Sequence, residues 1–395
     1  MRIAIVWKND YPWDVRVEKF ARALQSGGHD VYILSANAQG QATSATLDGL
    51  HIRRLPATPS RWLNALVSIP FYLNPFWFRL AARVVARERI DLVIVRDLPL
   101  ILVGVWLKRR FRVPLVLDMA EDYPAMYRES LDIGGWRAWV YRIVKNPALM
   151  ALVERRTLPR VDHTFVVVEE SARRLQEQLG VPATRVSVVS NTPRIENLEA
   201  LAACAARDAH SGLQLVYTGF VQEARGLEVV VEAVALLRAR GVDVRFRIVG
   251  DGPYLPRLAR LVTARNLQSA VEFTGWVAHG EIGHHVREAD AGIIPHPKND
   301  HTDTTIPNKL FDFMACARPV VVSNAAPMER IVRDERCGLV FTAGSAQSLA
   351  AVLARMAADP AALENMGRNG AEAVRRRFHW ERDAQVLQEA VARLA

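Results

Sequence analysis

A lysine and an aspartate in the second half of the chain have the chemistry to hold a phosphorylated ligand. Lys309 lies in the first turn expected of the helix PNKLFDFMACA, which Pro307 opens after the polar loop HTDTT. A helix start offers unpaired backbone N–H groups and a partial positive charge. Asp312 follows one turn later and can accept hydrogen bonds from ribose hydroxyls. The stretch predicts a nucleoside diphosphate at the helix start. The alternative is an ordinary helix whose Lys309 and Asp312 face water.

An arginine and two glycine loops have a pattern that fits the same ligand. Arg225 follows the strand-end Gly219 in GFVQEARGLEVVV, and Gly250 and Gly252 follow another expected strand. Arginine binds phosphate oxygens in pairs, so Arg225 is a candidate for a second clamp on a diphosphate. Glycine loops after strands are common, however, and each of these patterns also fits a plain tight turn.

Acidic residues follow an apolar strand in the first half of the chain. Asp118, Glu121 and Asp122 belong to LDMAEDYP. A buried carboxylate without a partner is costly, so we expect these groups to orient acceptor hydroxyls or to act as acid/base groups. Two further pairs fit either an acceptor site or surface ion pairs. They are Asp14 with Arg16, in or just after the first loop, and Arg96 with Asp97, at the end of another expected strand. The predicted acceptor-binding residues are Asp14, Arg16, Arg96, Asp97, Asp118 and Tyr123.

The histidines and cysteines predict no metal site. His284, His285, His296 and His301 lack ligand-like spacing with carboxylates, and we expect them in loops or at the surface. Three widely spaced cysteines show no disulfide or metal pattern, which fits a reducing cytoplasm. The sequence therefore predicts neither a metal nor a cofactor. The opening MRIAIVW is expected to be a first strand rather than a signal peptide.

The elements that would position these residues alternate as strand, helix, strand. The pattern opens with a strand over Arg2–Trp7, a helix over Val15–Ser26 and a strand over Val31–Leu34, then restarts at Leu213 after the turn-rich break Ser190–Pro193. This alternation predicts an α/β protein with two doubly wound, Rossmann-like domains and a ligand cleft between the carboxyl ends of both sheets. The expected domains are residues 1–190 and 191–379, with a last helix at about 380–395 that packs back on the first.

The net charge of +9 lies wholly in the first half, where residues 1–190 hold 27 Lys and Arg against 18 Asp and Glu. In residues 61–89 aromatic residues alternate with arginines, and residues 136–145 have the same mixture of aromatic and basic residues. A third basic cluster spans residues 108–112. Broken aromatic and basic segments suit an anionic membrane interface, and the alternative is core aromatics beside a solvated charged face. No nucleic-acid motif accompanies the charge, and no apolar run predicts a transmembrane helix.

The ordered set of motifs resembles the retaining glycosyltransferases of family 4, which have the GT-B fold. The matching pieces cover nearly the whole chain and are DVRVEKFARALQSGGHDVYIL, VRDLPL, LDMAEDYP, YTGF with ARG, IVGDGP, FTGWV, ADAGIIP and IPNKLFDFMACARPVVVSN. The resemblance implies a nucleotide-sugar donor on the second domain and an acceptor on the first. It also implies metal-independent transfer with retention at the anomeric carbon.

Residue by residue, the resemblance implies a modified donor site. The family's two glutamates, eight positions apart, fall on Thr304 and Asp312, and its Arg–Lys pair falls on Phe220 and Arg225. The histidine of the first-domain acidic motif falls on Ala120. The implied catalytic residues are Glu121, Asp122, Arg225 and Lys309. The implied donor-binding residues are Gly219, Arg225, Gly250, Gly252, Thr304, Thr305, Ile306, Pro307, Asn308, Lys309 and Asp312.

The resemblance and the basic first half together suggest a cytoplasmic enzyme at the inner face of the cell membrane. Its acceptor would be a lipid-linked sugar or an oligosaccharide. One alternative of the same fold is a nucleotide-sugar 2-epimerase, which would consume donor without an acceptor. The other is a catalytically inactive GT-B partner subunit, which would bind nucleotide without turnover.

Overall fold

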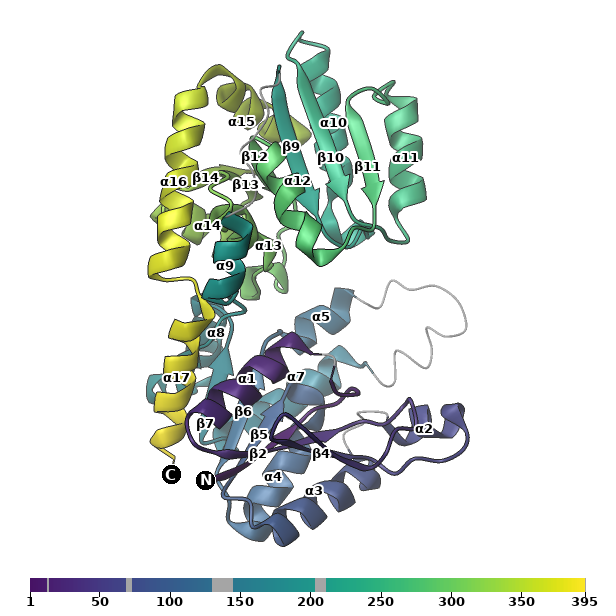
Figure 1. The fold of residues 1–395 in the computed structure, drawn as a ribbon, viewed down its shortest axis with the longest axis vertical. Helices are drawn as coiled ribbons and strands as arrows, with labels where there is room; N and C mark the ends of the chain where they lie inside the picture. The colour runs from purple at the N-terminus through teal and green to yellow at the C-terminus, as the bar shows by residue number, and fades with distance from the viewer. Residues whose placement is uncertain (13, 69–72, 130–144, 203–210, 395) are drawn as a thin grey trace. The chain divides into compact units, whose positions relative to one another are not determined.

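The computed structural model describes residues 1–12, 14–68, 73–129, 145–202 and 211–394 (Figure 1). They form two compact units. Unit 1 comprises residues 1–190 and 383–395, and unit 2 comprises residues 191–382. The chain passes from the first unit to the second after Ser190, and it returns to unit 1 within its last helix.

Unit 1 is built on an eight-stranded sheet in the order β3-β4-β2-β1-β5-β6-β7-β8. All neighbouring strands are parallel except β3 and β4, which are antiparallel. The strands are β1 Arg2–Val6, β2 Asp30–Ser35, β3 Ser44–Leu47, β4 Leu50–Arg54, β5 Leu92–Arg96, β6 Leu115–Met119, β7 His163–Val166 and β8 Val186–Val188. The helices are α1 Val15–Ser26, α2 Arg61–Ser68, α3 Pro75–Glu88, α4 Ile101–Phe111, α5 Tyr123–Glu129, α7 Pro147–Thr157 and α8 Glu169–Leu179; the last helix, α17 Trp380–Ala392, returns to this unit.

Unit 2 has a six-stranded parallel sheet in the order β11-β10-β9-β12-β13-β14. Helix α10 packs against α15, and α13 packs against α16. The strands are β9 Leu213–Thr218, β10 Val244–Val249, β11 Val271–Gly275, β12 Ala291–Ile294, β13 Val320–Ser323 and β14 Gly338–Phe341. The helices are α9 Ile195–Ala202, α10 Leu227–Arg238, α11 Leu255–Ala264, α12 Ile282–Glu288, α13 Lys309–Ala315, α14 Ala326–Asp334, α15 Ala346–Ala358 and α16 Pro360–Arg376.

Apolar burial explains why these segments fold into sheets. Strands β5 and β6 are buried at every residue, as expected for parallel strands covered on both faces. Each unit has a core of its own, with Trp77 at the centre of the first and Phe246 in the second.

In each sheet the strand order reverses at one place, where a ligand crevice is expected. In unit 1 this place lies between the neighbouring parallel strands β1 and β5. In unit 2 it lies between β9 and β12. The segments that leave these strands at their carboxyl ends begin at Trp7 and Asp97 in unit 1, and at Gly219 and Pro295 in unit 2.

The polar loop HTDTT contains a 3-10 turn over Thr302–Thr304, in which both threonines are buried. Thr302 and Asn299 bond each other's backbone N–H groups through their side chains. The helix expected from Pro307 begins two residues later and has only seven residues, Lys309–Ala315. The described residues contain no helix long and apolar enough to cross a membrane.

Candidate functional site

The predicted phosphate-binding cation Lys309 lies against the end of strand β9. Its ammonium lies 3.7 Å from the centre of the Tyr217 ring, a cation–π contact. A Cβ atom at Gly219 would lie 3.0 Å from the same ammonium. The side chain of Lys309 therefore crosses from α13 to the first residue after β9, at the point where the strand order of unit 2 reverses.

Arg225 belongs to the same place. It ends the 3-10 turn Glu223–Arg225, and Gly226 then starts α10 with φ +68°. A Cβ at Gly226 would lie 2.4 Å from the carbonyl oxygen of Pro295, so this turn packs directly on the segment that leaves β12. With its amide oriented to accept, Gln222 takes hydrogen bonds from Arg225 Nε and Nη2 at 3.2 and 3.3 Å.

The electrostatics show that the two cations act on each other. Burial lowers the pKa of Lys309 well below its ordinary value, and Arg225 lowers it further, whereas Asp312 opposes the shift. Burial raises the pKa of the Tyr217 hydroxyl to about 12, with Arg225 opposing. Two like charges held close together at low solvent exposure destabilise each other, and a bound anion would relieve that repulsion.

The glycine loops predicted to bind the donor cross each other at the same sheet edge. Gly219 has φ +122° and Gly250 has φ +145°, both disfavoured for residues with a Cβ. A Cβ at Gly250 would lie 2.0 Å from the carbonyl oxygen of Gly219, and one at Gly252 would lie 2.1 Å from that of Val221. The glycines are therefore required because the two backbones approach each other too closely for a side chain.

The remaining predicted donor residues lie along the segment from the 3-10 turn to α13. Thr304 is buried, and its hydroxyl donates to the carbonyl oxygen of Asp300 at 2.8 Å. Ile306 is buried, Thr305 and Pro307 are half-buried, and Asn308 is exposed just before α13. The diphosphate contact with the start of α13, a helix of seven residues, stays a prediction.

His296 lies in a loop, as one reading of the sequence expected, but it is buried rather than at the surface. It lies two residues after β12 and is 4% exposed. Its Nε2 atom is buried and has no hydrogen-bond partner among the described residues. Burial lowers the pKa of His296 well below its ordinary value, and the charges of Lys309 and Arg225 and the neighbouring His301 lower it further. Its place directly after a buried strand was the signal that could have found it.

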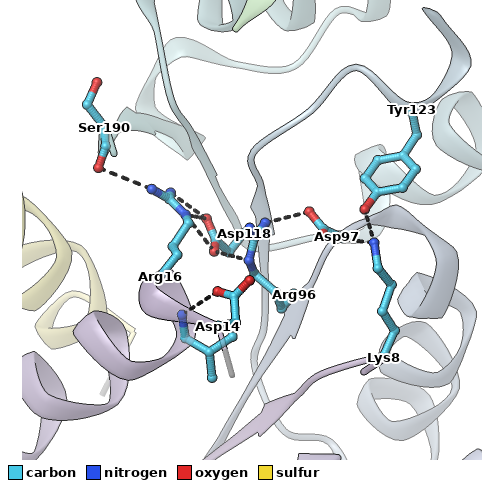
Figure 2. A network of polar contacts seen from close by, with 9 residues as sticks. Lys8, Asp14, Arg16, Arg96, Asp97, Asp118, Tyr123 and Ser190 are labelled. Carbon is cyan, nitrogen blue, oxygen red and sulfur yellow. Dashed lines mark hydrogen bonds and ion pairs between the residues drawn. The ribbon is translucent and has the colours of Figure 1, made fainter. Parts of the chain in front are cut away.

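The residues predicted to bind an acceptor meet at the carboxyl edge of the unit 1 sheet (Figure 2). Arg16 Nη2 donates to Asp118 Oδ1 at 2.6 Å, and Arg16 Nε bonds both carboxylate oxygens. Arg96 pairs with Asp97 and also with Asp118. Asp14 does not pair with Arg16 and instead caps helix α1 by accepting from the backbone N–H of Val17.

These ion pairs give two of the acidic side chains a structural role beside the predicted acceptor role. Asp118 is 1% exposed and Arg16 is 5% exposed, so the pair is enclosed rather than at the surface. Asp122 is also buried, pairs with Arg174 at 2.7 Å, and caps the start of α5. Glu121 is half-buried. The binding of an acceptor by this set stays a prediction, and Glu121 is its more accessible carboxylate.

Lys8, which the sequence analysis did not single out, extends this network toward solvent. It pairs with Asp97 at 3.1 Å and donates to the hydroxyl of Tyr123, which is buried (Figure 2). Burial alone would raise the pKa of Asp97, but Arg96 and Lys8 outweigh it and lower that pKa. Burial and Asp97 raise the pKa of Tyr123. Asp97 holds φ +71°, so the network fixes a backbone conformation that is strained for this residue.

The aromatic segments of unit 1 divide between core and surface. Trp77 is fully buried, and Phe76 and Phe78 pack against the core. These three rings therefore do not form the membrane interface that the sequence suggested, and they match the alternative of core aromatics. Trp62 on α2 is 72% exposed, and Trp106 on α4 is also exposed, one turn before the basic end of that helix. Phe71, Tyr72 and residues 136–144 lie outside the described residues.

Comparison with known proteins gives the family. Residues 14–192 match the model of the glycosyl transferase 4-like domain, and residues 212–359 match that of the glycosyl transferases group 1. This chain belongs to the glycosyltransferases of family 4. Its fold is GT-B, with two Rossmann-like domains, as predicted.

Relatives and solved structures agree with this assignment. The chain is 29% identical to the alpha-D-kanosaminyltransferase of Streptomyces kanamyceticus over 40% of this chain and 39% of that protein. It is 29% identical to the amylovoran biosynthesis glycosyltransferase AmsK of Erwinia amylovora over 45% of this chain and 43% of the relative. These matches span less than half of each relative. Anabaena HepE in complex with UDP-glucose shares the fold, with a TM-score of 0.69, 16% identity and full coverage of both chains.

Proposed function

We propose that this protein is a retaining glycosyltransferase that moves a sugar from a nucleoside-diphosphate donor to a hydroxyl group of an acceptor. The observation that carries the proposal is the approach of the Lys309 ammonium to Gly219, at the strand-order reversal of unit 2, where the charge of Arg225 also acts on Lys309. A cationic, glycine-lined sheet edge suits a diphosphate. Membership of a glycosyltransferase family suggests that this diphosphate belongs to a sugar donor. A UDP-glucose complex of a fold relative supports a nucleotide sugar as substrate.

The proposed mechanism uses charge rather than a protein nucleophile or a metal. As the glycosidic bond to the diphosphate breaks, negative charge develops on the leaving phosphate oxygens. Lys309 and Arg225 stabilise that charge, and partial burial strengthens both interactions. The acceptor hydroxyl attacks the same face of the sugar, and its proton passes to an oxygen of the departing diphosphate. Glu121 orients the acceptor in unit 1, while Asp122 holds Arg174 and α5 in place.

The proposed acceptor is a lipid-linked sugar at the cytoplasmic face of the membrane. A relative named for amylovoran biosynthesis makes a surface-polysaccharide acceptor chemically reasonable. The exposed Trp62 and Leu63 of α2, and Trp106 beside Arg109 and Arg110 at the end of α4, suit an anionic lipid surface. Docking there would present the enzyme to an acceptor that does not leave the bilayer.

Donor screening and donor turnover test the proposal. Thermal-shift measurements against nucleoside diphosphates and their sugars should identify one base that stabilises the fold, because a ligand of the native state raises the melting temperature. The stabilising sugar nucleotide is then incubated with and without membrane extract. Transfer requires acceptor-dependent release of the diphosphate. Retention requires in addition that the anomeric configuration of the product, read by NMR, is unchanged from the donor.

The same measurements separate the alternatives. Donor consumption that is equal with and without acceptor would indicate a 2-epimerase. Binding of a nucleotide sugar with no turnover in any extract would indicate an inactive partner subunit. An inverted anomeric centre in the product would disprove retention while leaving transfer intact.

A further inference from the structure

His296 combines deep burial with an unsatisfied polar atom at the edge of unit 2 where the donor is proposed to bind. It follows β12, the strand beside β9 at the reversal of strand order. The preceding carbonyl, that of Pro295, lies against Gly226, immediately after Arg225. The histidine is therefore in the segment that packs against the phosphate-binding turn, although it lies more than 70 positions from that turn in the chain.

The unsatisfied atom indicates that a ligand belongs beside it. Buried nitrogen atoms almost always have a hydrogen-bond partner, because an unpaired one has lost its water without compensation. Nε2 of His296 is buried without a partner among the described residues, whereas nearby hydroxyls such as those of Thr302 and Thr304 are bonded to backbone carbonyls. These two hydroxyls are thus satisfied by carbonyls of the same loop, whereas Nε2 of the imidazole is not.

The surrounding charges select the chemistry of that ligand. Lys309 on α13, Arg225 on its 3-10 turn and His301 all act on His296, and each disfavours a further positive charge. The imidazole therefore remains neutral and can offer an N–H at Nε2. A neutral donor flanked by two cations is matched to an anionic oxygen, and a hydrogen bond to a charged acceptor is stronger than a neutral one.

We propose that His296 is a donor-binding residue whose Nε2–H donates a hydrogen bond to a phosphate oxygen of the bound nucleoside diphosphate. The inference rests on the proposed function and adds a third phosphate contact to Lys309 and Arg225. Nε2 is enclosed, so the contact requires a neighbouring side chain to move. Lys309, whose charge acts on His296, is the candidate for that movement, because its ammonium contacts the Tyr217 ring and a bound anion would attract it.

Calorimetric titration of nucleoside diphosphates tests this contact in the full chain. UDP, GDP, ADP and dTDP are titrated into the wild type, and the tightest binder into His296→Phe and His296→Gln. His296→Phe keeps the ring and removes the donor, so we expect at least about tenfold weaker binding. His296→Gln retains an N–H donor and should rescue most of the loss. His284→Phe is the matched control, because His284 is an exposed histidine of the same unit, on α12.

A spectroscopic measurement on the wild type keeps the inference falsifiable if a variant folds poorly. In protein labelled with ¹⁵N-histidine, the Nε2 resonance of His296 is assigned by its absence from the spectrum of His296→Gln. It should shift on saturation with the diphosphate, while the His284 resonances stay in place. A wild type that binds a diphosphate with no such shift and no loss in His296→Phe would overturn the inference alone. A wild type that binds none of the four nucleotides would overturn the proposed function, and the inference with it.

Discussion

The ammonium of Lys309 lies 3.7 Å from the centre of the Tyr217 ring, and the two residues come from segments more than 90 positions apart. Tyr217 is the second-to-last residue of β9, and Lys309 is the first of α13. In the absence of an anion the ring partly compensates a charge that burial and Arg225 both destabilise. The contact therefore holds the Lys309 ammonium beside the loop that is proposed to bind the diphosphate.

Removing either cation should slow catalysis strongly. We expect Lys309→Ala and Arg225→Ala each to reduce kcat/KM by about 100-fold or more, because each group stabilises charge that develops in the transition state. The measurement is acceptor-dependent release of nucleoside diphosphate. Arg247→Ala is the control, since Arg247 pairs with Glu272 and Glu288 on another part of unit 2. Wild-type rates in both Lys309→Ala and Arg225→Ala would disprove the phosphate assignment.

Neutralising Lys309 should stabilise the ligand-free protein. Lys309→Met keeps the length of the side chain and removes the charge that burial and Arg225 disfavour. The change also loses the smaller favourable interaction of that charge with Asp312. One kcal/mol corresponds to roughly 2–4 °C in a unit of this size. We expect the melting temperature at neutral pH to rise by about that amount. The increase in melting temperature that a nucleoside diphosphate causes should disappear in the same variant, because the variant lacks the cation proposed to bind the phosphate.

The pH dependence of that difference has a definite sign. The folded-state pKa of Lys309 lies below the unfolded value, so between the two the unfolded chain binds more protons, and wild-type stability rises with pH relative to Lys309→Met. The advantage of the variant should be largest below the depressed pKa and should vanish toward about pH 10.5. Melting temperatures of both proteins across this window provide the check. An advantage that grows with pH would show that Lys309 is not destabilised by its surroundings.

The close approach of the two glycine loops predicts unequal effects of alanine at equivalent sites. Gly250→Ala places a Cβ 2.0 Å from the carbonyl oxygen of Gly219, so the β9 and β10 loops must separate. Gly275→Ala, at the end of the next strand, meets nothing within 4 Å and adds only the cost of its positive φ. We expect Gly250→Ala to weaken nucleotide binding at least about tenfold and Gly275→Ala to lose only about 1 kcal/mol of stability. Equal effects on binding and on urea denaturation would contradict this account.

The buried pair of unit 1 should behave as a coupled unit. Arg16→Met leaves Asp118 with less compensation in the core, and Asp118→Leu does the same to Arg16, so each single change should cost about 3–5 kcal/mol. The double variant removes both charges and should lose less than the sum. A double-mutant cycle by denaturant unfolding measures the difference. Because Arg96 also pairs with Asp118, additive losses would assign the stabilisation to Arg96 rather than to Arg16.

Membrane docking predicts salt-sensitive binding to anionic vesicles. The protein should sediment with liposomes rich in phosphatidylserine or phosphatidylglycerol at low salt and be released at high salt, because the charge component is screened. Trp62→Ser with Leu63→Ser should reduce this binding by removing the exposed apolar residues of α2. Trp276→Ser, which removes a tryptophan that is 79% exposed in unit 2, is the matched control. No sedimentation at low salt would remove the argument for a lipid-linked acceptor.

The sequence determined the architecture because the relevant signals are local. Apolar runs bounded by glycine and proline place the parallel strands, and helices between them predict two doubly wound sheets. The same signals locate Gly219, Arg225 and Lys309 at the carboxyl ends of strands or at helix starts. They miss the antiparallel strand β3, Ser44–Leu47, because three of its four residues are exposed and it has no apolar pattern.

Only the tertiary structure decided which polar side chains are partners and which remain unsatisfied. Asp118, on β6, and Asp122, three residues after that strand, looked alike in sequence, yet Arg16 and Arg174, from distant helices, pair with them. His296 lies in a loop, as expected, but only the structure shows that it is buried and that the adjoining Pro295 packs against Gly226. Sequence patterns report on neighbours within a few residues, whereas charge pairing and desolvation depend on segments brought together by the sheet. The order of the strands and helices thus determined which charged residues lie at the same sheet edge. The packing determined which polar groups have partners within the protein and which remain available to a ligand.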